Sequence, residues 1–361
     1  MAKKKKLTGG VIVGRIILVL LTTVLAVALS AVVILGTIIK GPSETARDTF
    51  VTTVLESGNL KFLAHVFLSE KEINEIVEKT SMGEIEADIN TELIDTEGEV
   101  EGNFNEDGIE IVTINGSSYY ATLLIVKDPS KVICGTTYNG GWGEMGKNLH
   151  EIVNLEKAVA GVNGGLYAAD LNKGGSPYGV CVSKGQILLN DPSAWTGCHM
   201  IGLDKNNLLR IEKIDTWSSA QFEQYVKDNG IRDAVAFQDE ASDANNHFVS
   251  LVINGEAREL NGAGSGANPR TAIGQRADGA ILLLVTDGRG ASGHLGATAA
   301  DLISIMLKYG AVNAANLDGG SSSCMVYFGQ APDNYLMHST TLWASNDSWN
   351  MPTAFVVMKG E

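Results

Sequence analysis

Two aspartates of this 361-residue chain stand at the ends of apolar, strand-like runs, each with glycine close behind. Asp287 follows the run ILLLVT, and Asp318 follows AVNAANL. Residues at strand ends lie on loops that a rigid sheet holds in place, and active sites are commonly built there. A carboxylate in such a position can transfer a proton, attack a carbon atom or bind a cation. Both aspartates are therefore candidate catalytic residues.

Two arginines occupy segments of the same kind, in a chain whose formal net charge is −15. Arg270 opens the apolar run that begins with Thr271, and Arg289 follows Asp287 with only Gly288 between them. A guanidinium in an acidic protein needs an anionic partner, which is either a structural carboxylate or a phosphate group of a substrate. For Arg289, a surface ion pair with Asp287 is the alternative.

Neutral hydrogen-bonding groups make up the rest of the candidate site. Asn163 can both donate and accept hydrogen bonds, and Gly164 and Gly165 after it allow close backbone approach, although such a pair also suits a tight turn. A second loop offers backbone N–H groups and hydroxyls that suit an oxyanion. Its members are Gly319, Gly320, Ser321 and Ser322. His294 is interpreted either as a proton shuttle or as an ordinary loop histidine.

Several other chemistries lack their sequence patterns. No G-x-x-x-x-G-K-[ST] segment of a nucleotide-binding P-loop occurs, and no G-x-S-x-G segment of a serine hydrolase. No spaced set of His, Asp and Glu demands a metal, although Asp287 and Asp318 carry the oxygen ligands that calcium and magnesium prefer. We therefore expect no cofactor and leave a divalent cation open.

The elements that must present these residues are mainly short strands from about residue 107 onward. Runs such as IEIVTI, YYATLLIV and HMIGLD are separated by turn residues, and helical patterns interleave at 218–230 and 298–309. Lys184-Gly185 and Asn254-Gly255 predict hairpin turns. The predicted fold class is α+β, with a mixed strand-rich α/β catalytic domain over 107–361.

The N-terminal part predicts a membrane anchor at 1–40. Residues 16–39 are an uncharged apolar run, and a helix of this length spans about 36 Å, enough for a hydrocarbon core of about 30 Å. Lys3–Lys6 and Arg15 precede the run, so the positive-inside rule predicts a single-pass protein with a cytoplasmic N-terminus and an extracytoplasmic remainder. A cleaved signal peptide is the alternative, although its apolar region is normally about 7–15 residues long.

Residues 41–106 connect the predicted anchor to the predicted catalytic domain. The first part has apolar residues at helical spacing, and Ser69 with Glu72 fits a capping box. From 82 to 106 the chain is acidic and punctuated by glycine, as a linker would be. We predict a helical spacer and an acidic linker without chemistry of their own.

Charge and cysteine content restrict the partners and the compartment. A surface this acidic repels the phosphates of nucleic acids, which excludes them as partners and means that a phosphate-bearing substrate needs a local basic site. The four cysteines show no CxxC spacing. Cys181 and Cys198 either form a disulfide in an oxidising compartment or are small buried thiols.

Several segments, in the expected order, resemble the phosphodiester glycosidase family over about 108–361. They are NGGLY at 163–167, PRTAIG at 269–274, LLLVTDGR at 282–289, GATAADLISIMLKYGAVNAANLDGGSSSCMV at 296–326 and PTAFVV at 352–357. The family commonly has an arginine before the last segment, where this chain has Ser348-Trp349-Asn350-Met351. That departure leaves the identity of the substrate open.

The resemblance implies an enzyme that hydrolyses the sugar–phosphate bond of N-acetylglucosamine-1-phosphate diesters in a bacterial envelope polysaccharide or exopolysaccharide. Asp287 and Asp318 would then act at the anomeric carbon, while Arg270 and Arg289 would stabilise the phosphate. The expected partners are this glycan and, through residues 16–39, the membrane. Two alternatives stay open: a metal-dependent phosphodiesterase that uses the same aspartates, and a non-catalytic glycan-binding protein on the same fold.

Overall fold

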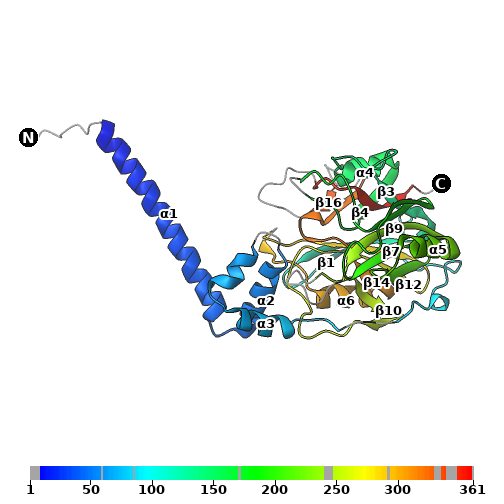
Figure 1. Ribbon diagram of the computed structural model, residues 1–361, viewed down its shortest axis with the longest axis horizontal. Helices are drawn as coiled ribbons and strands as arrows, with labels where there is room; N and C mark the ends of the chain where they lie inside the picture. The colour runs from blue at the N-terminus through cyan, green and yellow to red at the C-terminus, as the bar shows by residue number, and fades with distance from the viewer. Residues whose placement is uncertain are drawn as a thin grey trace, which may run out of the picture.

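A long apolar helix and a strand-rich body make up the protein (Figure 1). The computed structural model describes residues 9–57, 60–83, 85, 87–169, 172–239, 247–290, 293–328, 335–338 and 348–359. Strands and helices mix in the body, and the sheets are antiparallel, which confirms the predicted α+β class.

The helix α1 (Gly9–Lys40) contains the whole predicted apolar run and projects away from the rest of the chain (Figure 1). It has no acidic residue in its first turn, and in the described part of the chain it is the one helix long and apolar enough to cross a membrane. Its side chains are exposed until the last turns, where Ile39 is buried. Membrane insertion itself stays a prediction.

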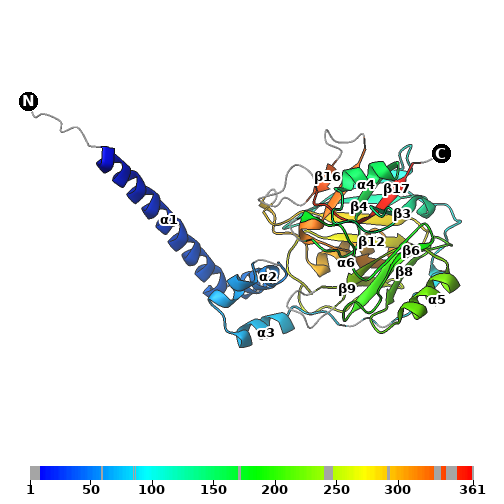
Figure 2. The ribbon, with the colours of Figure 1, turned by 45° about the horizontal axis from the view of Figure 1, so that its top comes forward.

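Three short helical elements pack beside the end of α1 (Figure 2). They are α2 (Glu44–Leu55), the 3₁₀ helix η1 (Lys61–Val66) and α3 (Glu70–Glu78). Ser69 and Glu72 form the predicted capping box at the start of α3. The three elements bury a small apolar core of their own together with Ile39, which includes Val51, Leu55 and Ile73. This helical unit therefore packs around the C-terminal end of α1.

Three antiparallel sheets form the body. The seven-stranded sheet has the order β1 (Ile109–Asn115), β2 (Tyr120–Val126), β13 (Ile281–Thr286), β12 (Thr271–Arg276), β14 (Ala311–Asn316), β10 (Ser250–Ile253) and β11 (Glu256–Ala257). One five-stranded sheet has the order β16 (Tyr335–His338), β15 (Cys324–Tyr327), β4 (Ala158–Asn163), β17 (Thr353–Met358) and β3 (Val132–Thr136). The other has the order β6 (Gln186–Asn190), β5 (Val180–Ser183), β9 (Ile231–Gln238), β7 (Cys198–Asp204) and β8 (Leu209–Lys213).

Helices cover the outer faces of these sheets. They are α4 (Leu149–Leu155), which contacts β4, α5 (Ser219–Asn229), which contacts β6 and β9, and α6 (Ala299–Lys308), which contacts β10 and β14. The short 3₁₀ helices η2 (Thr91–Leu93), η3 (Pro129–Lys131) and η6 (Gly320–Ser322) lie in connections. As predicted, α6 ends just before Gly310, which takes the left-handed conformation (φ +84°) typical of a residue after a helix.

The core lies on both faces of the seven-stranded sheet. Alternate residues of a strand point to opposite faces, and in β13 Leu283 packs in a cluster with residues of all three sheets, while Leu282 and Leu284 pack with α6 on the other face. Both β12 and β13 are almost fully buried. The central strands therefore form a rigid support for the loops at their ends.

Local turn chemistry agrees with the predictions. Lys184-Gly185 and Asn254-Gly255 all have positive φ and close the two predicted hairpins.

The segment 82–106 runs along the body, where the Asn90 N–H donates to Asn254 Oδ1 at 2.7 Å and the Asp95 N–H donates to the Ala277 carbonyl at 2.8 Å.

All four cysteines are buried free thiols, so the buried-thiol interpretation is the one observed. Burial raises the pKa of Cys198 and of Cys324 to about 12. These thiols therefore stay protonated and unreactive at neutral pH.

Gly165 provides a test of the sheet packing, because a Cβ built there would lie 2.3 Å from the Ala236 carbonyl oxygen. We expect Gly165→Ala to lower the free energy of unfolding by about 1–3 kcal/mol through overpacking, measured by urea denaturation followed by tryptophan fluorescence. Gly141→Ala is the matched control, since a Cβ at Gly141 meets no atom within 4 Å. Equal stabilities of the two variants would contradict this packing.

Candidate active site

The register of β12 brings three of the predicted loops together. Thr271 pairs with Val285 of β13, and Ala272 pairs with Asn316 of β14. Because both pairings are antiparallel, the C-terminal ends of β13 and β14 lie on either side of the start of β12. The loops after Val285 and Asn316 therefore meet at Arg270.

A cavity of about 150 Å³ opens at this junction. Six of its lining residues are sequence-predicted site residues: Arg270, Arg289, Asp318, Gly319, Gly320 and Ser321. Five others were not predicted: Glu56, Phe237, His247, Asn268 and Asn316. The cavity thus combines two cationic with two anionic side chains and a rim of neutral hydrogen-bonding groups.

Asp318 is the carboxyl group of the β14 loop in this cavity. Burial raises its pKa to about 6, although the Ser322 hydroxyl, the Gly319 N–H and Arg289 each favour the ionised form. Gly319 N donates to Asp318 Oδ1 at 2.9 Å, and Ser322 Oγ lies 2.9 Å from Tyr167 Oη. Asp318 thus changes its charge close to neutral pH, which suits a group that exchanges protons.

Asn163 and Thr271 lie beneath Asp318 and connect two sheets. Asn163 Nδ2 donates to the Asp318 carbonyl at 2.7 Å, while its Oδ1 accepts from Thr271 Oγ1 at 2.6 Å and from the Cys324 N–H at 3.2 Å. The four residues that these three bonds join are all buried or half-buried. Asn163 and Thr271 therefore hold the backbone of the Asp318 loop and do not line the cavity.

Arg289 reaches the cavity from the β13 loop. Its Nη1 donates to Ser321 Oγ at 2.9 Å, and its backbone has φ +54°, a left-handed conformation uncommon for a residue with a Cβ. Although the residue as a whole is exposed, desolvation of its guanidinium and the neighbouring Arg270 lower its pKa. The two guanidinium groups therefore line one cavity and act on each other electrostatically, an arrangement that suits an anion.

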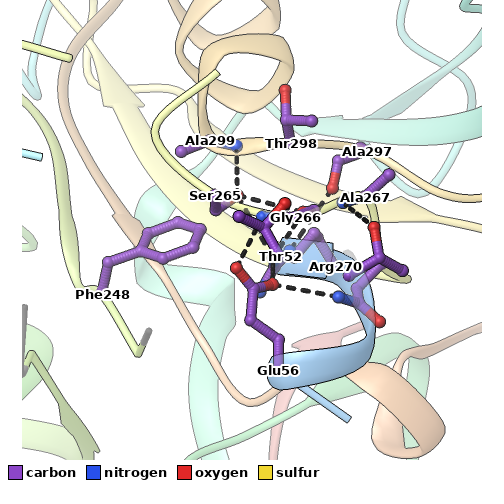
Figure 3. Close-up of polar contacts among 12 residues, drawn as sticks. Thr52, Glu56, Phe248, Ser265, Gly266, Ala267, Arg270, Ala297, Thr298 and Ala299 are labelled. Atoms are coloured by element: carbon purple, nitrogen blue, oxygen red, sulfur yellow. Dashed lines mark hydrogen bonds and ion pairs between the residues drawn. The ribbon is translucent and has the colours of Figure 1, made fainter. Parts of the chain in front are cut away.

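Arg270 is held by a carboxylate from the helical unit (Figure 3). Its Nη2 forms an ion pair with Oε2 of Glu56, which directly follows α2, and also donates to the Gly266 carbonyl at 2.9 Å. The guanidinium lies over the Phe248 ring, 4.9 Å from its centroid. Arg270 therefore has a structural carboxylate as its partner, which is one of the two interpretations from the sequence, and it also lines the cavity.

Asp287 and His294 lie together but do not line the cavity. Asp287 Oδ1 accepts from the Tyr120 N–H at 2.7 Å, and Oδ2 lies 2.7 Å from His294 Nδ1. Gly288 packs against Gly296, leaving no room for a Cβ. Of the two predicted aspartates the structure therefore brings only Asp318 to the cavity, and a direct catalytic role for Asp287 stays a prediction.

The Gly164–Gly165 pair lies behind the cavity. Gly164 N donates to the Thr353 carbonyl at 3.1 Å, and its own carbonyl accepts from the Asp318 N–H at 3.3 Å. A Cβ on either glycine would come closer than 3 Å to neighbouring atoms. The pair thus serves close packing of the strands that carry the site.

The five unpredicted lining residues had little local signal. Phe237 is the last residue but one of β9 and His247 precedes β10, so neither lies in a glycine-rich strand-end loop. Asn316 is the last residue of β14, and its buried Oδ1 has no hydrogen-bond partner among the described residues. A sequence signal existed for Glu56, because an acidic residue at the C-terminal end of a helix is unfavourable.

A second cavity, of about 400 Å³, lies between Ile85, Ala87 and Asp88 on one side and strands β7, β8 and β10 on the other. It contains the buried ion pair between Arg258 and Asp239, and none of the predicted site residues lines it. We therefore place the candidate active site in the smaller cavity.

No three His, Cys, Asp or Glu residues cluster as metal ligands in the described part of the chain.

Comparisons with known proteins show the family and the fold of the chain. The family model described as phosphodiester glycosidase matches residues 156–358, more than half of the chain. The catalytic domain of zebrafish N-acetylglucosamine-1-phosphodiester alpha-N-acetylglucosaminidase, auto-inhibited by its pro-peptide, superposes with a TM-score of 0.51 at 18% identity, over 70% of this chain and 82% of that one. This likeness shows the fold.

Two further proteins are similar over smaller shares or at lower scores. A putative exported protein from Burkholderia pseudomallei K96243 has a TM-score of 0.42 at 16% identity, over 66% of this chain and 74% of that one. The SPbeta prophage-derived uncharacterized protein YomE of Bacillus subtilis (strain 168) is 48% identical over 56 residues. That match spans 16% of this chain and only 8% of the relative's length.

The raised pKa of Asp318 predicts a pH-dependent effect on stability. A carboxyl whose pKa is higher in the folded than in the unfolded chain stabilises the fold below about pH 4 and loses this contribution as the pH rises through about 6. Relative to the unaltered chain, Asp318→Asn should therefore gain about 1–3 kcal/mol in free energy of unfolding between pH 4 and pH 7.

Urea denaturation of both proteins at each pH measures this gain, and the other titrating groups cancel in the difference. A difference that does not change with pH, or that changes with the opposite sign, would contradict the raised pKa.

Proposed function

The chain belongs to the phosphodiester glycosidase family, and we propose that it hydrolyses the sugar–phosphate bond of N-acetylglucosamine-1-phosphate diesters. The observation that carries this proposal is the placement of Asp318 beside Arg289 in one cavity, under a rim of Gly319, Gly320 and Ser321. A carboxyl group titrating near neutral pH and a cationic group for a phosphate are the two functions that this reaction needs.

The chemistry follows from the leaving group. A phosphate monoester is already a stable anion, so its protonation contributes less than in an ordinary glycosidase, and stabilisation of its negative charge contributes more. The bond between the anomeric carbon and the phosphate oxygen breaks, and the oxygen of water ends on that carbon. We assign Arg289 to the departing phosphate and ionised Asp318 to the anomeric carbon, where positive charge develops.

The rest of the cavity would hold the sugar. The unpaired Oδ1 of Asn316 can accept a hydrogen bond from a sugar hydroxyl or from the acetamido N–H. Phe237 and His247 also line the cavity, with their ring centroids 5.5 Å apart and their planes tilted by 43°, and provide an aromatic surface for the sugar. We propose Asp287 and His294 as supports of the Arg289 loop, since Asp287 also binds the Tyr120 backbone.

We further propose that the enzyme is anchored in the membrane by α1 and acts on the outer side, on envelope polysaccharide or exopolysaccharide of a bacterium. The length and apolar character of α1 support the anchor, and the lysines before it support the orientation. Arg270 and Asp318 line one cavity and Asp287 does not, so these three predicted residues converge only in part. A glycan-binding protein without activity therefore stays the alternative that the product analysis decides.

Product analysis tests the proposed function. With the methyl diester of N-acetylglucosamine-1-phosphate, the full chain in detergent micelles should release free N-acetylglucosamine and methyl phosphate. Asp318→Asn should lower kcat by about 10²–10⁴-fold, whereas Asp191→Asn, which removes an exposed carboxylate outside the cavity, should not. Release of N-acetylglucosamine-1-phosphate would instead identify a phosphodiesterase, and binding without turnover would identify a glycan-binding protein.

The pH profile tests the role of Asp318 separately. Because the proposed reaction needs the ionised carboxylate, kcat/KM should fall tenfold per pH unit below an apparent pKa of about 6. A steady-state profile from pH 4.5 to 8 measures this limb. Activity that instead falls as the pH rises through 6 would assign Asp318 as a proton donor and overturn its proposed role.

A further inference from the structure

Glu56 places a carboxylate from the membrane-proximal helical unit at the edge of the candidate active site (Figure 3). Its Oε1 accepts from the Gly266 N–H at 2.6 Å, and its Oε2 accepts from Asn268 Nδ2 at 3.0 Å and pairs with Arg270 Nη2. Only 3% of the Glu56 side chain is exposed. Three donors from one loop therefore converge on this carboxylate, although more than 200 positions separate it from them.

The position of Glu56 is unfavourable unless these donors compensate for it. The residue caps the C-terminal end of α2, where the helix dipole disfavours a negative charge, and burial removes the carboxylate from water. The surrounding fit is close, since Thr53 Oγ1 accepts from the Ala267 N–H at 3.0 Å and a Cβ on Gly266 would lie 2.5 Å from Thr53 N. The helix is thus docked on this loop in one defined position.

Glu56 binds only one edge of the Arg270 guanidinium. Nη2 is shared among Glu56, Ser265 Oγ and the Gly266 carbonyl, and Nε faces the Ala297 carbonyl at 3.4 Å. Nη1 has no hydrogen-bond partner among the described residues, and Arg270 lines the cavity. One edge is therefore fixed, while donors of the other edge are left for an anion in the cavity.

The charges support the same interpretation. Arg270 lies close enough to Arg289 to lower its pKa, whereas Glu56 and Asp318 raise it. Without Glu56, two guanidinium groups would face each other with Asp318 as the remaining anion of the cavity lining. Asp318 would then form an ion pair with the arginines, and its carboxylate would no longer be available to the anomeric carbon of the sugar. Glu56 balances the second arginine and leaves Asp318 free for the sugar.

We propose that Glu56 is a positioning residue, supplied by α2, that orients Arg270 so that its Nη1 edge binds the phosphate of the substrate. The proposal rests on the proposed function for the identity of the anion. It makes the helical unit between membrane and sheets a part of the active site, where the sequence had predicted a spacer without chemistry.

The test uses the full chain in detergent micelles. Glu56→Ala should lower kcat/KM for the methyl diester by about 10- to 100-fold, because a displaced Arg270 no longer meets the phosphate. Added formate, which can occupy the place of the missing carboxylate, should restore part of this activity in a saturable way. Glu56→Gln keeps the side-chain volume and should show a smaller loss, which guards against a folding defect.

Glu44→Gln is the matched control. It removes a carboxylate from the first turn of the same helix, where the side chain is exposed and outside the cavity. This variant should keep the activity of the unaltered chain and should not respond to formate. If Glu56→Ala lost activity only because its fold is damaged, added formate would not restore that activity.

Two results would overturn the proposal. If the Glu56 variants are more active and formate inhibits them, Glu56 blocks the anion site and does not complete it. If their activity is unchanged, or if the loss in Glu56→Ala does not respond to formate, Glu56 does not position Arg270 for the substrate. Should the unaltered chain hydrolyse no diester, the proposed function fails on its own; calorimetric binding of inorganic phosphate, lost in Glu56→Ala and restored by formate, then still decides whether Glu56 positions Arg270.

Discussion

The antiparallel pairing of β12 with both β13 and β14 is the constraint on which the candidate site depends. It brings the ends of two buried strands to the start of a third, so that Asp318, Arg289 and Arg270 come from three segments and share one cavity. Since the three strands are packed on both faces, the strand ends that carry these loops are held in fixed positions relative to one another. The precision of the site therefore comes from the sheet and not from the loops.

Compensation of charge is the second condition, because the cavity gathers two arginines and two carboxylates. Two arginines and two carboxylates make the set neutral when all four are ionised. The low polarity that raises the pKa of Asp318 also strengthens every hydrogen bond to it. In a chain of net charge −15, this small basic pair is what allows an anionic substrate to approach.

Local chemistry was predictable from the sequence, whereas long-range contacts were not. Three features depend on neighbouring residues and were therefore predictable: capping by Ser69, the hairpin turn at Asn254-Gly255 and the position of Asp318 just after a strand. Asp287 has the same local setting as Asp318, but its oxygens are bound by Tyr120 and His294. Glu56 was missed because its partners follow more than 200 positions later, beyond any periodic pattern.

The place of β17 has a consequence for how the protein is made. This strand follows every other described strand along the chain, yet it lies between β3 and β4, which come about 200 residues earlier. The two early strands do not pair directly, so they keep open edges until residue 358 has been synthesised. During synthesis, the edges of β3 and β4 that β17 later joins are therefore available for pairing with other strands, which is a route to misfolding or aggregation.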